Sequence, residues 1–154
     1  MIRLRVPGEL QYRDLAIRVV AAACKLVRDD EKSGDRDFES QVVSAFGEAF
    51  NNVAIHGYEG RERGDVDVEI EVEGDRITIY VTDTGSSFDF TNVPEPALDD
   101  LPEGGLGVFI IKSFMDEVSY RAGRPNVLRI TKRFGAHAAP ERPDRSDEAG
   151  DKTG

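Results

Sequence analysis

The stretch EAFNNVAIHG, residues 48–57, carries the first chemical signal in the sequence. It closes a segment, starting near Phe38, in which apolar residues recur at three- and four-residue spacing, a pattern that predicts a helix. Glu48, Asn52 and His56 stand four apart, which places them on one stripe of that helix with about 6 Å between successive residues. A carboxylate one turn from an amide oxygen suits the activation of a hydroxyl beside Mg²⁺, although a solvated polar stripe is the simpler explanation of this spacing alone.

The segment that follows predicts a hairpin with an unexpected carboxylate at its end. Residues 66–72 and 77–81 alternate between apolar and polar side chains and flank a turn at 73–75. Asp83 continues the apolar positions of the second strand, so a carboxylate stands where an aliphatic side chain is expected. It then needs donors, from neighbouring backbone or from the amino group of a ligand. The alternative, that the strand simply ends at a turn begun by Asp83, is equally supported.

A third signal is the glycine cluster GGLG at residues 104–107, which opens a further helix. Glycines at a helix N-terminus let backbone N–H groups approach phosphate oxygens. The cluster matches neither a Walker A loop nor a dinucleotide-binding fingerprint, and a flexible hinge would use the same residues. Between residues 83 and 107 periodicity is absent over a length that is usually functional, which predicts a lid.

The remaining patterns complete the expected fold. Further strands are predicted at residues 2–6, 118–120 and 126–133, and further helices at 10–27 and 108–115. This order predicts an α/β (α+β) two-layer sandwich, in which helices cover one face of a mixed, mostly antiparallel sheet. Residues 1–134 form one predicted domain, and residues 135–154, poor in apolar side chains, are predicted to be a disordered acidic tail.

Composition narrows the classes of partner. The 154 residues include 30 acidic and 20 basic side chains, a net charge of −10, which is the wrong sign for binding a nucleic acid directly or an anionic membrane. Cys24 is the single cysteine, so no internal disulfide can form. No apolar run approaches the roughly 20 residues that a membrane span requires. We therefore expect a cytoplasmic protein.

In this order, EAFNNVAIHG (48–57), DTGSSF (83–88) and GGLG (104–107) resemble the N, G1 and G2 boxes of the GHKL ATPase superfamily. The resemblance covers about residues 10–133. Within the superfamily, the tyrosine after the N box and the run GLGVFIIKSFMDEV (105–118) look like the bacterial anti-sigma factor serine kinases of the sporulation and general-stress switches. Three ordered motifs carry the superfamily resemblance.

The resemblance implies a Bergerat-type ATP-binding fold and assigns roles to individual residues. Glu48 would act as general base, and Asn52 would hold Mg²⁺ against the ATP phosphates. Asp83 would accept a hydrogen bond from the adenine amino group, Gly85 would let the chain pass close to the base, and Phe88 would pack in the pocket. The other implied nucleotide-binding residues are Gly104, Gly105, Leu106, Gly107 and Val108 at the phosphates, and Thr131, which would support the adenine contact through the aspartate.

The resemblance also implies activity and partners. Members of this family pair as homodimers through sheet edges, sequester a sigma factor when loaded with ATP, and phosphorylate a serine on a STAS-type antagonist. We therefore expect an ATP-dependent serine/threonine protein kinase that is an anti-sigma regulatory factor. The alternatives are a non-catalytic ATP-gated protein-binding module and a stand-alone histidine-kinase-like ATPase domain.

Two departures from the family pattern bear on catalysis. Ser87 stands where the G1 box often has a second glycine. The lid segment 98–103 has three acidic residues and no Lys or Arg, so only Mg²⁺ and Lys112 remain to offset phosphate charge. The sequence therefore predicts slow turnover.

Overall fold

The computed structural model describes residues 1–27, 37–90 and 105–135. Most of the expected lid and nearly all of the expected tail lie outside these ranges. The strands are β1 (Ile2–Pro7), β2 (Asp65–Glu73), β3 (Arg76–Asp83), β4 (Glu117–Arg121) and β5 (Asn126–Arg133). The helices are α1 (Arg13–Cys24), α2 (Phe38–Asn51) and α3 (Gly105–Phe114), with a short 3₁₀ turn η1 (Leu10–Tyr12) and a π-helical turn η2 (Asn52–Gly57).

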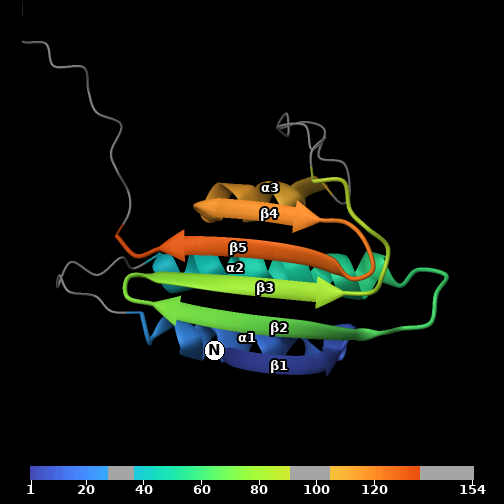
Figure 1. The fold of residues 1–154 in the computed structure, drawn as a ribbon, viewed down its shortest axis with the longest axis horizontal. Helices are drawn as coiled ribbons and strands as arrows, with labels where there is room; N and C mark the ends of the chain where they lie inside the picture. Colours follow the sequence, from blue (N-terminus) through green and yellow to red (C-terminus); the bar gives the residue numbers. More distant parts are fainter. Residues whose placement is uncertain (28–36, 91–104, 136–154) are drawn as a thin grey trace, which may run out of the picture.

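The five described strands form one sheet in the order β1-β2-β3-β5-β4 (Figure 1). Every pairing among them is antiparallel, whereas the sequence led us to expect a mixed, mostly antiparallel sheet. The physical reason lies in the connection between the first two strands. Pro7 at the end of β1 pairs with Asp65 at the start of β2, so α1 and α2 together return the chain to the end of the sheet that it left.

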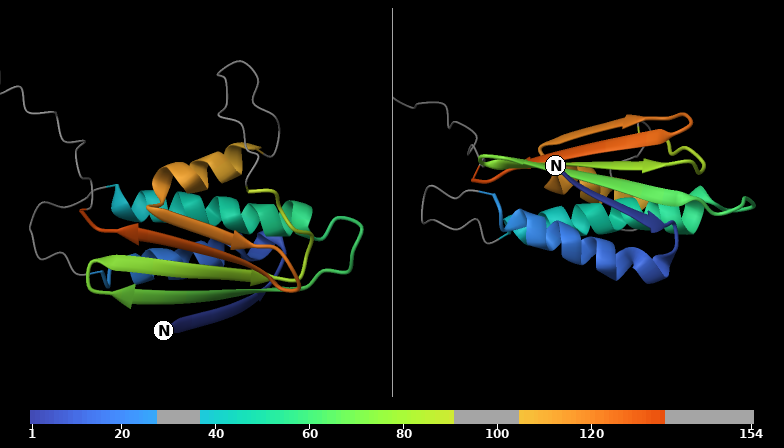
Figure 2. Two further views of the ribbon diagram at one scale, coloured as in Figure 1. Left: turned by 45° about the horizontal axis from the view of Figure 1, so that its top comes forward. Right: turned by 60° about the horizontal axis from the view of Figure 1, so that its bottom comes forward.

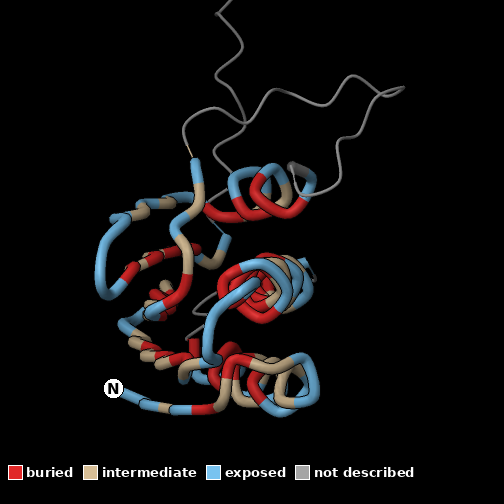
Figure 3. The backbone as a smooth tube through the Cα atoms, turned by 90° about the vertical axis from the view of Figure 1, so that its right-hand side faces the viewer, coloured by how far each residue is buried: buried red, intermediate tan, exposed pale blue. Residues whose placement is uncertain are grey.

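All three helices cover the same face of the sheet, and the predicted two-layer architecture is confirmed (Figure 2). The alternation read from the sequence explains which face is covered, because Val66, Val68 and Ile70 of β2 are buried while their neighbours are not. From α2, Phe46 and Phe50 are fully buried against that face. In Figure 3 the buried segments of helices and strands face one another, which locates the core between the layers.

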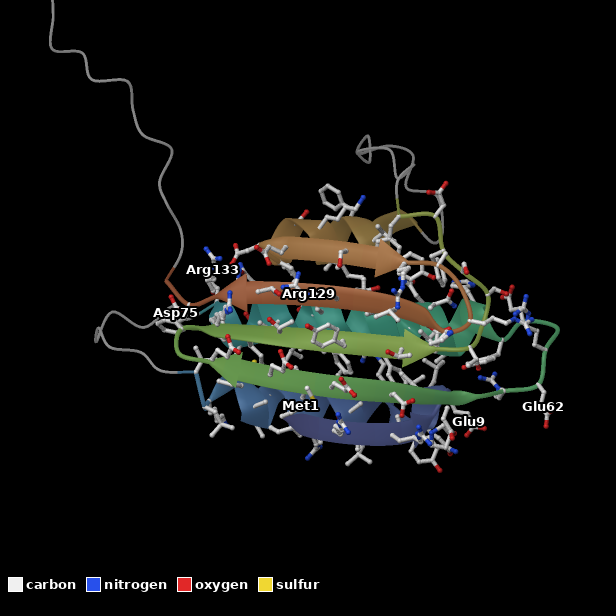
Figure 4. The ribbon with its side chains drawn as sticks, in the orientation of Figure 1. Met1, Glu9, Glu62, Asp75, Arg129 and Arg133 are labelled. Carbon is white, nitrogen blue, oxygen red and sulfur yellow. The ribbon has the colours of Figure 1, made fainter. Side chains whose placement is uncertain are left out.

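The opposite face of the sheet is polar and carries no helix among the described residues (Figure 4). Charged side chains form cross-strand pairs on it, such as Arg5 with Asp67, whose nitrogen and oxygen lie 2.6 Å apart. Exposed pairs of this kind contribute little to stability, so the core and not this face holds the fold together. Within the described ranges, no helix is long and apolar enough to cross a membrane.

Candidate nucleotide-binding site

The start of α3 lies directly against the C-terminal half of α2, which brings two of the three predicted stretches together (Figure 1). A Cβ atom built on Gly107 would lie 2.9 Å from Oε2 of Glu48 and 3.5 Å from Oδ1 of Asn52. A side chain at position 107 would crowd the Glu48 carboxylate, whereas its distance from the Asn52 oxygen would be an ordinary contact. The glycine cluster therefore has a packing partner, and the partner is the predicted carboxylate–amide pair.

The helix that carries this pair does not stay α-helical. It changes to a π-helical turn at Asn52, a feature found often at functional sites. Asn52 is 8% exposed, and its Nδ2 is buried without a hydrogen-bond partner in the described part of the chain. His56 lies apart from this buried position, with an exposed side chain whose Nδ1 is 3.4 Å from Oε1 of Glu59. A buried donor without a partner is uncommon in proteins, so Asn52 is a candidate ligand-binding residue.

Asp83 is 6% exposed at the last position of β3, on the face that the helices cover. Its Oδ1 accepts hydrogen bonds from the backbone N–H of Gly85, at 2.8 Å, and from Nδ2 of Asn126, at 3.1 Å. Burial raises the pKa of the Asp83 carboxyl, and these two hydrogen bonds act against the rise. β3 ends at Asp83, and the Asp83 carboxylate is buried and hydrogen-bonded. Both interpretations of the sequence, a strand end and a buried carboxylate, therefore apply to this residue.

Gly85 stands at a close crossing of two backbones. A Cβ atom on Gly85 would lie 2.5 Å from the carbonyl oxygen of Gly57, and the N–H of Ser86 donates to that same oxygen at 2.6 Å. The end of η2 and the loop after β3 are therefore locked together. In this structure the glycine serves the contact between the first and second predicted stretches.

An apolar pocket opens beside the Asp83 carboxylate. Its lining residues are Ala49, Asn52, Val53, Val81, Asp83, Phe88, Phe90, Tyr120 and Leu128. The backbone N–H of Phe88 donates to the Tyr120 hydroxyl at 2.9 Å, and the Phe90 ring stacks on the Tyr120 ring with centroids 4.5 Å apart. The cavity has aromatic walls and one buried carboxylate, groups that suit a planar ring bearing an amino group, but its volume is only about 10 Å³, so such a ring fits only if the aromatic side chains move aside.

Thr131 is not part of this pocket. It pairs with Thr78, and the two hydroxyl oxygens lie 3.0 Å apart. Asp83 pairs instead with Asn126, five positions earlier on β5, which is about 17 Å along the strand. Thr131 and Asn126 are an odd number of positions apart, so their side chains point to opposite faces of the sheet, and Thr131 lies on the uncovered face. The expected support of Asp83 by Thr131 is therefore replaced by Asn126, which the sequence analysis missed because its amide lies in a segment assigned only as a strand.

The remaining predicted residues come from the sequence around and within α3. Gly104 lies outside the described residues, and Gly105 begins α3. Leu106 is exposed and Val108 is buried in the core, so neither side chain lines the pocket. The Lys112 ammonium donates to the carbonyl oxygen of Phe90, which ties α3 to the loop that carries the pocket aromatics.

Comparison with known proteins places this site in a family. Residues 7–132 match the model of the histidine kinase-like ATPase domain. The chain belongs to the histidine kinase-like ATPase family. This confirms the GHKL resemblance, and ATP is the nucleotide that the family name specifies.

Relatives of this histidine kinase-like ATPase domain have similar lengths. The chain is 37% identical over 142 residues to the serine-protein kinase RsbW of Bacillus subtilis, covering 85% of this chain and 84% of that protein. It is 37% identical over 101 residues to the anti-sigma F factor of Clostridium beijerinckii, covering 62% and 71%.

A solved structure confirms the fold. The histidine kinase domain of the blue-light activated histidine kinase of Erythrobacter litoralis EL346 superimposes with a TM-score of 0.50 at 18% sequence identity. The match covers 79% of this chain and 60% of that longer one.

Proposed function

We propose that this protein is a cytoplasmic ATP-dependent serine/threonine kinase and an anti-sigma factor, which sequesters a sigma factor and phosphorylates a serine of a STAS-type antagonist. One observation carries the proposal: Gly107 at the start of α3 lies against Glu48 and Asn52, within the fold of a histidine kinase-like ATPase. Relatives that match the chain over most of its length are named serine-protein kinase or anti-sigma factor.

The residues around the pocket provide groups that would bind the adenine base. Both described hydrogen bonds of the Asp83 carboxylate go to Oδ1, which leaves Oδ2 to accept from the adenine amino group. Phe88 and Tyr120 supply apolar surface for the ring. The free N–H groups at the start of α3 and the positive end of its dipole then face the phosphates.

The residues present also fit Mg²⁺. The Asn52 side chain is buried, and its Oδ1, an oxygen of the kind that Mg²⁺ prefers, lies near the Gly107 backbone. Among the described residues no three His, Cys, Asp or Glu side chains gather as a metal cage. This suits an ion that takes few protein ligands and most of its oxygens from phosphate and water. When bound, Mg²⁺ supplies neutralisation of phosphate charge.

Glu48 performs the proton transfer in this proposal. Its carboxylate takes the proton of the acceptor serine as the serine oxygen bonds to the γ-phosphorus. The bond from that phosphorus to the ADP oxygen breaks, and ADP leaves with the electron pair. A positioned base of this kind contributes about 10²- to 10⁴-fold to the rate. The Gly107 backbone lies close to the Glu48 carboxylate, which places this base beside the start of α3.

We also propose that the protein forms a homodimer through a sheet edge. Among the described strands, β1 and β4 are the two edges of the sheet, and each pairs with a neighbouring strand on one side only.

The experiment compares the wild type with Glu48→Gln, which keeps the size of the side chain and removes the base. Each protein is titrated with Mg-ATP by calorimetry, then incubated with Mg-ATP and the STAS-type protein of the same genome, and phosphorylation is located by mass spectrometry. We expect both to bind ATP and only the wild type to produce a phosphoserine. ATP binding by the wild type without transfer would favour the ATP-gated binding module, and transfer to a histidine would favour the histidine-kinase-like alternative.

A further inference from the structure

Asn126 is the most fully hydrogen-bonded side chain near the pocket. It is 0% exposed at the first position of β5, beside Asp83. Its Nδ2 donates to Oδ1 of Asp83 at 3.1 Å and to the carbonyl oxygen of Gly85 at 2.9 Å. Its Oδ1 accepts from Oγ of Ser87 at 2.6 Å and from the backbone N–H of Gly123 at 3.0 Å.

These four hydrogen bonds use the whole capacity of an amide side chain, which has two N–H donors and two acceptor sites. The network also fixes which way the amide faces. Asp83 and Gly85 offer acceptors, whereas the Gly123 backbone offers a donor, so the nitrogen must face the former pair. No residue of similar size supplies two donors on one side and two acceptor sites on the other.

The four partners come from two different segments. Three belong to the loop of residues 83–88, and Gly123 belongs to the turn between β4 and β5. A second tie runs between the same segments, because the Phe88 N–H donates to the Tyr120 hydroxyl of β4. The β4–β5 hairpin therefore holds this loop at both ends.

The network gives a reason for Ser87. A glycine at this position would bring conformational freedom to the loop, but it would leave one acceptor site of Asn126 empty. Serine instead donates its hydroxyl to Asn126 at 2.6 Å. The departure from the glycine pattern adds a fixed contact to the loop.

We propose that Asn126 is a positioning residue for nucleotide binding, which together with Ser87 holds the Asp83 carboxylate in the orientation that selects a purine bearing a 6-amino group. This inference rests on the proposed ATP-binding function. Asn126 does not itself line the pocket in the described structure. It acts through the carboxylate oxygen that it shares with the Gly85 N–H, so that Oδ2 of Asp83 stays aimed at the base.

The test measures base discrimination, which a merely structural role would not move. The full chain is titrated with Mg-ATP and with Mg-ITP, whose base has an oxygen in place of the amino group. The wild type is expected to prefer ATP. Asn126→Ala is expected to lose about 10- to 100-fold in ATP affinity and to bring the two affinities within a few-fold, because a hydrogen bond to a charged group is lost. Ser87→Ala is expected to lose about 3- to 10-fold.

The matched control is Thr78→Val. It also removes a buried hydrogen-bonding side chain between β3 and β5, but on the uncovered face and away from Asp83. It is expected to lower the melting temperature and leave the ATP-to-ITP ratio at the wild-type value. Ser87 is exposed, so Ser87→Ala keeps the inference testable if Asn126→Ala does not fold.

The outcomes distinguish a failure of the positioning role from a failure of the proposed function. If the wild type prefers ATP and either folded variant keeps the wild-type ratio and affinity, the positioning role is refuted while the proposed function stands. If the wild type binds neither nucleotide, the proposed function is refuted and this inference falls with it.

Discussion

Single residues in the site are held in surroundings that folding alone would not favour. Asp83 is a nearly buried carboxylate on an otherwise apolar strand face, and the Asn52 amide is buried with an unpaired nitrogen. Each arrangement costs folding free energy, because a charge loses its hydration or a donor lacks an acceptor. In the proposed function, the nucleotide supplies further hydrogen-bond partners to both side chains.

The first prediction concerns Asp83→Asn and pH. Burial raises the folded-state pKa of Asp83 above its ordinary value of 3.8. The protonated carboxyl therefore stabilises the fold fully below about pH 3.8, and that contribution is lost as the pH rises through the folded-state pKa. Asparagine does not titrate, so the stability of Asp83→Asn relative to the wild type should increase over the same rise in pH. ATP affinity should fall.

Urea unfolding of both proteins from pH 4 to pH 8 measures this difference, and calorimetry measures the affinity. A stability difference that stays constant with pH would show that burial does not raise the pKa of the Asp83 carboxyl.

The second prediction concerns the crossing of two backbones at Gly85. In Gly85→Ala the new methyl group would lie 2.5 Å from the Gly57 carbonyl oxygen, and neither backbone can yield without moving η2 or the loop. Overpacking of this kind costs about 1–3 kcal/mol, and we expect ATP affinity to fall with it. Gly57→Ala is the control from the same crossing, because its methyl group would come no nearer than 3.6 Å to any neighbour. Equal stability of the two variants in urea would contradict the prediction.

At the scale of elements, the sequence predicted the helices and strands whose apolar residues recur at regular spacing. Alternation identified the β2–β3 hairpin, and helical spacing identified α2 together with η2, as far as Gly57. The change to a π-turn at Asn52 was not predicted, because one wider turn leaves the apolar spacing almost unchanged. Thr131 was assigned to the pocket by its motif alone, whereas its odd separation from Asn126 puts it on the other face. The places of Asn126 and Thr131 depend on how β5 pairs with β3, and a local sequence pattern does not specify strand pairing.

The third prediction tests how α3 meets α2. In Gly107→Ala the new methyl group would lie 2.9 Å from Oε2 of Glu48, at the flexible end of that side chain. Glu48 can move aside at little cost in stability, so we expect a melting temperature within a few degrees of the wild type. Displacement of the base should lower phosphate transfer by at least about 10-fold.

Ser113→Ala is the control on the same helix, since Ser113 is exposed and outside the pocket. Single-turnover phosphorylation assays on both variants measure the effect. Wild-type transfer by Gly107→Ala would mean that the contact with Glu48 has no part in catalysis.

At the scale of the whole molecule, the fold brings three stretches that lie far apart in sequence to one end of the sandwich. The predicted site residues Glu48, Asn52, Asp83 and Gly107 come from α2, η2, β3 and α3 respectively. The order of these stretches in the sequence identified them as a set of motifs, but it could not show the contacts between them. Asn126 and Tyr120 come from the β4–β5 hairpin, and only the folded sheet places them beside the loop of residues 83–88.

The fourth prediction follows from ligand linkage. A nucleotide that binds only the folded state at 100 times its Kd stabilises that state by about 2.7 kcal/mol, which for a chain of this length raises Tm by roughly 5–10 °C. We expect this shift with Mg-ATP, and a smaller one with ATP plus EDTA, because Asn52 would lose its metal partner. Differential scanning fluorimetry measures both shifts. Identical Tm shifts with and without EDTA would contradict the proposed binding of Mg²⁺ at this site.

The fifth prediction locates the end of the folding unit. The family model ends at residue 132, but the structure shows Phe134 joined to the domain, with its N–H donating to the Asp75 carbonyl oxygen at 2.6 Å and its ring 5.3 Å from that of Phe38. We propose that a chain ending at residue 135 unfolds in urea and binds Mg-ATP as the full chain does. A chain ending at residue 133 should lose about 1–3 kcal/mol, because one aromatic side chain and its contacts are removed. If the chain ending at residue 135 is already destabilised, residues beyond it contribute to the fold, and the proposed boundary at residue 134 is wrong. If both truncated chains match the full one, the Phe134 contacts contribute nothing measurable and the unit ends with β5.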